Sequence, residues 1–153
     1  MPVMEPTIVV SSQNAEDWGR QVTVEWPADG WVTAGDNSVP HGGTGTAPDG
    51  FGLMGAAFGV CMVTTLIEIA KQLGLPLTSV EALVATKAKL RGAELAPYLS
   101  DYHIDLYVHG DLDEQQRAEL ERLTAERCGV HESLLRAANV SERVQLGPAP
   151  ARV

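Results

Sequence analysis

Residues 50–73 read GFGLMGAAFGVCMVTTLIEIAKQL, and this stretch decides the fold. Residues 50–67 carry no charge, and Gly74 and Pro76 follow the stretch, so the pattern predicts one helix over 50–73. The first half is apolar on every side, whereas Glu68 and Lys71 give the second half a polar face. We therefore expect a central helix that the rest of the chain buries.

A membrane span is the alternative for this helix, because Gly55-x-x-x-Gly59 matches a motif of close helix packing. The uncharged run is only marginally long enough to cross a bilayer, and glycines dilute its hydrophobicity. We interpret it as a soluble helix packed on all sides, in which the glycines let another backbone approach closely.

The rest of the chain predicts an α+β fold with one domain over 1–153 and a loose tail over 147–153. The turn signal 27–30 and the alternation of apolar and polar residues indicate strands. Asp111-x-x-Glu114 resembles a capping box that opens a helix to about Arg127. The expected strands are 7–10, 21–26, 31–34, 79–90, 102–109 and one at Val144 and Leu146; the other expected elements are a loop over 35–48 and a short helix over 131–138.

Composition narrows the classes of function. The formal charge of −9 should repel phosphate backbones, so we expect no nucleic-acid partner. Two cysteines do not make the disulfide framework of a small secreted domain. The N-terminal residues lack the pattern of a signal peptide, and we expect a cytoplasmic protein in which a cysteine pair would cycle between redox states.

The candidate chemistry lies in Cys61 and Cys128, whose sequence settings differ. Cys61 lies in the apolar helix, where a free cysteine usually serves packing. Its thiolate needs a nearby cation or hydrogen-bond donor. Arg20 is the N-terminal candidate for that cation. The alternative, that Arg20 is an ordinary exposed residue of a strand, fits the sequence equally well.

Cys128 lies in a polar turn beside Arg127, with Arg122 nearby and His131 three residues later. Positive side chains and a helix start both stabilise a thiolate. Cys128 and His131 could also form half of a zinc site, but a structural site needs four ligands, so we expect no metal. The glycine-rich loop 41–48 lacks the Lys-Ser/Thr ending of a phosphate-binding loop. We read it as a flexible connection and expect no cofactor.

The arrangement of these pieces resembles the family of the osmotically inducible protein OsmC and the organic hydroperoxide resistance protein Ohr. The resemblance runs from the glycine-rich loop to the last expected strand, about two thirds of the chain. It is carried by residues 43–48 (GTGTAP), 53–61 (LMGAAFGVC), 73–76 (LGLP), 110–117 (GDLDEQQR) and 127–134 (RCGVHESL).

The resemblance implies an intertwined homodimer in which antiparallel sheet wraps a long central helix. It also implies a thiol peroxidase, with Cys61 as the peroxidatic nucleophile and Cys128 as the resolving thiol, helped by Arg20. The implied substrate is an organic hydroperoxide or hydrogen peroxide, and an external dithiol would regenerate the pair.

The sequence departs from the family at two places. The family has a glutamate in the first turn of the central helix, where this chain has Phe51 and Gly52, and Asp49 lies earlier. The proline of the family's Cys-Pro turn is Gly129 here. Two alternatives therefore stay open: a family member that binds an apolar small molecule between subunits without peroxidase activity, and a protein whose cysteines only pack.

Overall fold

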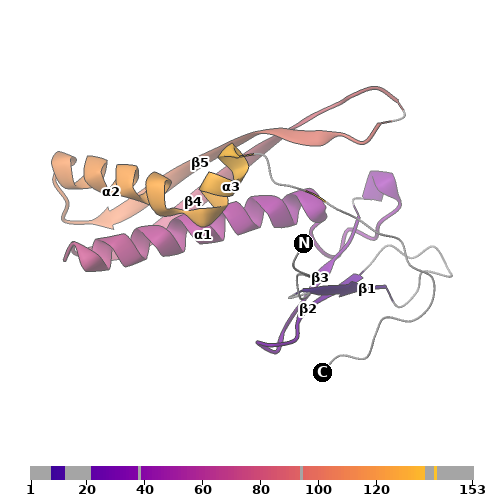
Figure 1. Cartoon of the computed structure of the whole chain (residues 1–153), viewed down its shortest axis with the longest axis horizontal. Coiled ribbons are helices and arrows are strands. Elements are labelled where there is room, and N and C mark those ends of the chain that lie inside the picture. The colour runs from indigo at the N-terminus through magenta and orange to yellow at the C-terminus, as the bar shows by residue number, and fades with distance from the viewer. Residues whose placement is uncertain (1–7, 13–21, 38, 94, 137–139, 141–153) are drawn as a thin grey trace.

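The computed structural model describes residues 8–12, 22–37, 39–93, 95–136 and 140. In this part of the chain, a three-stranded antiparallel sheet is followed by a long helix, a long β-hairpin and two further helices (Figure 1). The expectation of a mixed α+β fold is confirmed.

The N-terminal sheet has the order β1-β2-β3, with β1 (Val9–Ser11), β2 (Val22–Trp26) and β3 (Trp31–Gly35). Trp26 pairs with Trp31 across the turn 27–30, and Gly30 takes the left-handed φ of 69° that such a turn requires. The strands predicted here are confirmed within the described residues; Thr7 and Gln21, at the predicted strand starts, lie outside them.

The long helix α1 (Gly50–Gln72) follows a loop that contains the short 3-10 helix η2 (Val39–His41). The carboxylate of Asp49 caps α1 by accepting a hydrogen bond of 2.8 Å from the N–H of Gly52. The helix ends at Gln72, and Gly74 follows with a φ of 67°. The predicted bounds of this helix are therefore correct to one residue.

The hairpin consists of β4 (Leu77–Lys89) and β5 (Tyr98–Gly110), which pair antiparallel. The prediction for β4 was close, whereas β5 begins four residues before the predicted strand. An irregularity between Lys87 and Ala88 shifts the register, so that Lys87 pairs with Asp101 and Ala88 with Leu99. The first residues of β5 include the polar pair Ser100 and Asp101, which breaks the alternation of apolar and polar residues. The sequence pattern therefore did not predict this part of the strand.

The helices α2 (Glu114–Arg127) and α3 (Gly129–Leu135) complete the described fold. The predicted capping box at Asp111 and Glu114 is wrong: Asp113 caps α2 and forms the reciprocal pair with Gln116. The short helix begins two residues earlier than predicted, because the Cys128 side chain caps it. Ala138, the predicted strand at Val144 and Leu146, and the tail 147–153 lie outside the described residues.

Two neighbouring clusters form the core, and α1 contributes to both. Leu66, Ile69 and Ala70 pack against Leu120 and Leu123 of α2. Closer to the start of α1, Phe58 and Met62 pack around Cys128. The inner face of the hairpin covers both clusters, with side chains of Val80, Val84, Tyr102, Ile104, Leu106 and Val108.

The glycines of α1 allow the helix to approach β4 closely, as the sequence indicated. A methyl group added at Gly59 would lie 3.0 Å from Cγ2 of Val84, tighter than ordinary van der Waals contact. One added at Gly55 would lie 3.5 Å from Cγ2 of Thr86. The helix therefore lies against the sheet along its glycine face.

The prediction that α1 is packed on all sides is wrong for the single chain. One face of the helix exposes Val60 and Ile67, because α2, α3 and the hairpin cover the opposite side. By length and composition α1 would also suit a membrane span. Its buried side chains contact four other elements, β4, β5, α2 and α3, as is typical of a core helix.

Candidate functional site

The fold brings the two cysteines together. Cys61 lies in the middle of α1, and Cys128 lies at the junction of α2 and α3. Both cysteines belong to the cluster around Phe58 and Met62, and each thiol shifts the pKa of the other. Both cysteines are free. Residues 67 positions apart in sequence thus form a single dithiol site.

Cys128 owes its position to two helices that meet at its backbone. Its N–H donates to the Thr124 carbonyl at 3.0 Å and so ends α2, while its carbonyl accepts from the N–H of Glu132 at 3.0 Å inside α3. The Cys128 sulfur accepts a hydrogen bond from the backbone N–H of His131 at 3.4 Å, as the N-cap of α3. This turn directs the thiol inward, towards α1.

The burial of the two thiols is the reverse of the sequence expectation. Cys128, predicted to lie in a polar turn beside arginines, is 0% exposed, whereas Cys61 of the apolar helix is partly exposed. Consecutive side chains at the end of a helix point in different directions, so the polarity of one residue says little about the burial of the next. Oxidants therefore reach Cys61 more readily than Cys128.

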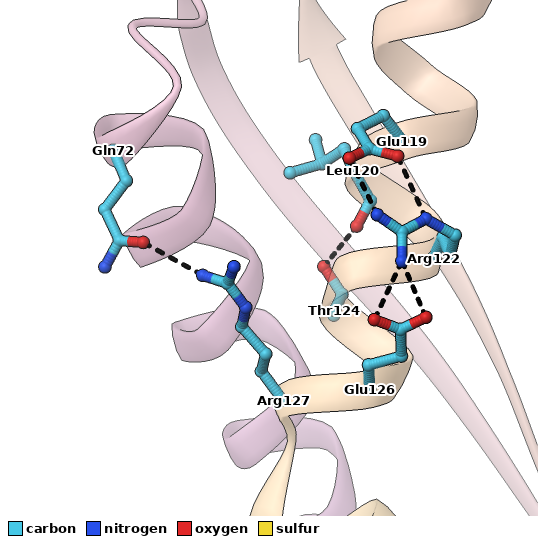
Figure 2. A network of polar contacts seen from close by, with 7 residues as sticks. All are labelled: Gln72, Glu119, Leu120, Arg122, Thr124, Glu126 and Arg127. Carbon is cyan, nitrogen blue, oxygen red and sulfur yellow. Dashed lines mark hydrogen bonds and ion pairs between the residues drawn. The ribbon is translucent and has the colours of Figure 1, made fainter.

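The arginines near Cys128 are bound elsewhere. Arg127 donates to the Gln72 side chain of α1 at 3.1 Å, as Figure 2 shows. Arg122 lies on the outer surface of α2, where its guanidinium donates to Glu119 at 2.8 Å and to Glu126 at 2.7 Å. These contacts tie α2 to α1 and to itself. The predicted stabilisation of a Cys128 thiolate by these arginines is wrong.

The pKa values of the two thiols move in opposite directions. Burial raises the pKa of Cys128, and the hydrogen bond with Cys61 raises it further. Burial also raises the pKa of Cys61, but donors outweigh it and leave that pKa below the ordinary value. The donors are the backbone N–H groups of Val130 and Gly129, the Cys128 thiol and the Thr65 hydroxyl. The pair therefore consists of a thiolate-prone Cys61 and a protonated Cys128.

A pocket of about 380 Å³ lies between α1, β5 and α3, and it shares Phe58 and Met62 with the cluster that contains Cys128. Its apolar wall is built by Phe58, Met62, Tyr102, Ile104 and the two leucines at the end of α3. The Phe58 ring meets Tyr102 edge to face, with 6.0 Å between ring centroids, and stacks on His131 at 6.2 Å. Such a pocket can bury a compact organic group.

The loop before α1 is organised around Asp36, which the sequence analysis missed. The Asp36 carboxylate accepts from the Thr44 hydroxyl at 2.5 Å and from the N–H groups of Asn37, Thr44 and Thr46. Those bonds, the Thr44 hydroxyl first, lower the pKa of Asp36 to about 2. The Asp36 N–H donates to the Pro48 carbonyl at 3.0 Å, which fixes the start of α1. No motif signalled this role, because the partners lie eight to ten residues away.

Three further predictions concern Arg20, a carboxylate at the start of α1 and a metal site. Arg20 lies outside the described residues, so its place relative to Cys61 is not part of this structure. No acidic residue lies in the first turn of α1, and the Asp49 carboxylate is occupied as the helix cap. Among residues 8–12, 22–37, 39–93, 95–136 and 140, no group of three or more His, Cys, Asp or Glu side chains gathers as a metal site would.

Comparison with known proteins decides the family. The sequence profile of the OsmC-like proteins matches residues 43–143, more than half of the chain. The chain belongs to the OsmC-like protein family. Among curated protein sequences, none matches this OsmC-like protein significantly.

Solved structures share the fold of this OsmC-like protein at low sequence identity. A structure from Psychrobacter arcticus has a TM-score of 0.72 at 18% identity, over 86% of this chain and 89% of the other. The OsmC-like protein of Mycoplasma pneumoniae has a TM-score of 0.72 at 14% identity, over 90% and 91%. A Legionella pneumophila protein named an organic hydroperoxide resistance protein OsmC has a TM-score of 0.61 at 17% identity, over 88% and 91%.

Proposed function

We propose that this protein is a thiol-dependent peroxidase that reduces organic hydroperoxides, or hydrogen peroxide, through Cys61 and Cys128. The observation that carries the proposal is the contact between two free thiols whose pKa values shift in opposite directions. A lowered pKa makes more of Cys61 a nucleophilic thiolate at neutral pH. Membership of the OsmC-like family, and the fold shared with a protein named for organic hydroperoxide resistance, support this assignment.

The proposed reaction begins at the more exposed sulfur. The Cys61 thiolate attacks the terminal peroxide oxygen, an S–O bond forms and the O–O bond breaks. The departing alkoxide takes a proton from water and leaves as the alcohol. The sulfur loses two electrons and becomes a sulfenic acid, while the peroxide gains them.

The buried thiol completes the cycle. Cys128 attacks the sulfenic sulfur, an S–S bond forms, and the departing hydroxide leaves as water with the Cys128 proton. An external dithiol then reduces the Cys61–Cys128 disulfide by exchange and is itself oxidised to a disulfide. The raised pKa of Cys128 suits this order, because the thiol keeps its proton until the sulfenic acid has formed.

We also propose that the working unit is a cytoplasmic homodimer with sites completed by both subunits. Two features favour the dimer. The first is the exposed apolar face of α1, since such faces mark interaction sites. The second is the position of the β1–β3 sheet, which lies beyond the start of α1 and apart from the hairpin (Figure 1). In this arrangement Arg20 would serve as the cation at the Cys61 thiolate.

A second candidate function is binding of an apolar small molecule at the dimer interface without peroxidase activity. The feature that favours it is the absence of an acidic residue from the first turn of α1. The carboxylate nearest to that turn in the sequence belongs to Asp49. It accepts a hydrogen bond from the N–H of Gly52 as the helix cap, so it is not positioned to orient an arginine.

Peroxide turnover with matched cysteine variants tests the proposed function. Reduced protein is mixed with cumene hydroperoxide and dithiothreitol, and peroxide loss is followed. Wild type should turn over repeatedly, and Cys61→Ser should reduce the rate to that of the reductant alone. Cys128→Ser should still form a sulfenic acid at Cys61 that dimedone traps.

Two outcomes would redirect the account. Peroxide loss that is as fast in Cys61→Ser as in wild type would remove the peroxidase proposal. A wild type that reacts no faster than free cysteine, but melts at a higher temperature when an apolar ligand is added, would favour the second candidate.

A further inference from the structure

The two sulfurs of the proposed disulfide differ in how easily a reductant reaches them. Cys128 is 0% exposed and packs with Phe58 and Met62 in one core cluster, whereas Cys61 packs against that cluster and is partly exposed. A second chain can only reduce exposure, so Cys128 stays covered in the proposed dimer. Cys61 must remain open to the peroxide if the proposed reaction takes place. An external dithiol therefore meets two unequal sulfurs.

The backbone fixes Cys128 in its covered position. Its N–H donates to the Thr124 carbonyl at 3.0 Å at the end of α2, and its carbonyl accepts from the Glu132 N–H at 3.0 Å in α3. Bringing the Cys128 sulfur to the surface would disturb both helix ends and remove apolar contacts from the cluster. Such an opening is populated in only a small fraction of molecules at any time. The Cys128 sulfur is therefore shielded from direct attack.

The surroundings of the Cys128 sulfur suit a leaving group instead. The backbone N–H of His131 donates to this sulfur at 3.4 Å. A hydrogen bond to a charged acceptor is stronger than one to a neutral acceptor, so this donor stabilises a thiolate more than a thiol or a disulfide. The turn that opens α3 can thus receive the negative charge when the disulfide breaks.

We propose that the external dithiol attacks the sulfur of Cys61, so that the mixed disulfide forms on Cys61 and Cys128 is the leaving group. This inference rests on the proposed peroxidase function and adds to it the order in which the disulfide is reduced. The partly exposed cysteine is then the place where peroxide and reductant both react.

The reduction takes two exchanges. The reductant thiolate forms an S–S bond to Cys61 as the Cys61–Cys128 bond breaks, and the Cys128 sulfur leaves with the electron pair and takes a proton from water. The second thiol of the reductant, as a thiolate, then attacks the sulfur that joins the reductant to Cys61, and the Cys61 thiolate leaves. The reductant loses two electrons as it closes to a cyclic disulfide, and the two cysteines gain them.

Leaving-group strength alone favours the reverse order in the first exchange. Burial raises the pKa of Cys128, whereas hydrogen-bond donors outweigh burial at Cys61 and lower its pKa, and a thiol of lower pKa leaves faster. Access outweighs this preference, because a covered sulfur is attacked only when the core opens. The same difference helps the second exchange, in which Cys61 leaves. It also keeps the freed Cys128 protonated, so that it attacks the mixed disulfide slowly.

The position of the first adduct tests the inference. Reduced wild type is oxidised with diamide, so that the disulfide does not depend on peroxide chemistry. It is then treated briefly with 2-mercaptoethanol, a monothiol that cannot resolve its own adduct. Acid stops the exchange by protonating thiolates, and peptic peptides are mapped by mass spectrometry without reductant. We expect the adduct on Cys61 in about tenfold excess or more over Cys128, because opening limits attack at a buried sulfur.

Unfolded protein and two variants serve as controls. In guanidinium chloride both sulfurs are accessible, and the two adducts should agree to within about threefold, since unfolded cysteines have similar pKa values. Phe58→Leu, which thins the cover of Cys128, should raise the share of adduct on Cys128. Ile69→Val shrinks a side chain of the other core cluster and should give the wild-type distribution. Melting curves verify that each variant is folded during the assay.

The outcomes separate this inference from the proposed function. An adduct on Cys128 that equals or exceeds the adduct on Cys61 in folded wild type would overturn the inference and leave the peroxidase standing. An adduct on Cys61 in a protein that does not reduce cumene hydroperoxide would overturn only the peroxidase. Failure of diamide to join Cys61 to Cys128 would overturn both.

Discussion

At the scale of single residues, the chemistry depends on how donors are shared between two sulfurs. The backbone N–H groups of the turn that opens α3 lower the pKa of Cys61, and the Cys128 thiol lowers it too. The lowered pKa of the partly exposed thiol therefore depends on backbone groups of residues 129 and 130. A substitution in that turn can change the reactivity of Cys61 without touching α1.

Gly129→Pro tests this dependence. Proline has no N–H, so the variant removes one donor and should raise the pKa of Cys61. The helix itself should tolerate the change, because proline suits a first helical position. Cys128 already has the extended backbone that precedes proline, with φ −74° and ψ 112°. The pH dependence of Cys61 alkylation by iodoacetamide, measured in a Cys128-intact protein, gives the midpoint directly.

Gly129→Ala is the matched control, because alanine keeps the N–H and the space around Cβ is open. The alkylation midpoint should move to higher pH in the proline variant and stay at the wild-type value in the alanine variant. Equal midpoints in all three proteins would mean that the Gly129 N–H does not act on Cys61.

Sequence reasoning at this scale found Cys61 and Cys128 but not their surroundings. Residue type and family resemblance identified the pair. The burial of Cys128 depends on which way a helix junction turns its side chains, and local composition does not encode that. Asp36 was missed for a related reason: its partners Thr44 and Thr46 are neighbours only after the loop has folded.

At the scale of elements, long periodic segments were predicted well and their ends less well. The uncharged run fixed α1 almost to the residue, because glycine and proline end it sharply. The prediction placed the capping box at Asp111 and Glu114, two residues before the pair Asp113 and Gln116, which has the same spacing. The structure selects Asp113 and Gln116, since these are the residues whose side chains bond back to the backbone.

Asp113→Ala and Asp111→Ala measure that choice. The Asp113 variant removes the acceptor for the Gln116 N–H at 2.8 Å, and the loss of such a cap should lower the free energy of unfolding by about 1 kcal/mol. The Asp111 variant should change it by less than about 0.5 kcal/mol, as expected for a surface site without such a role. Urea denaturation followed by circular dichroism gives both values. A larger loss in the Asp111 variant would contradict the assigned cap.

At the scale of the whole molecule, one chain leaves apolar surface that it does not cover. Val60 is 64% exposed and Ile67 is 48% exposed, on the face of α1 opposite the core. The prediction of a helix buried on all sides came from the same composition, and it fails for one chain because a hairpin and two short helices cannot surround α1. A second copy of the chain would supply the missing cover and explain the composition.

Val60→Glu tests this explanation. A charge in the proposed interface should dissociate the dimer to single chains, whereas the fold of each chain should survive because the site is exposed within it. Val60→Leu, the apolar control, should remain dimeric. Sedimentation equilibrium distinguishes the two masses. If wild type already sediments as a single chain, the dimer proposal is wrong.

The central claim, that the sulfurs of Cys61 and Cys128 act as one redox pair, is tested most directly by mass spectrometry of the product of a single oxidation. Reduced wild-type protein is treated with one equivalent of cumene hydroperoxide, digested without reductant and mapped. The account predicts one cross-linked peptide pair that joins Cys61 to Cys128 within a chain, with both free thiols lost together. Recovery of both cysteines as free thiols, or oxidation of Cys61 alone while Cys128 stays reduced, would contradict it.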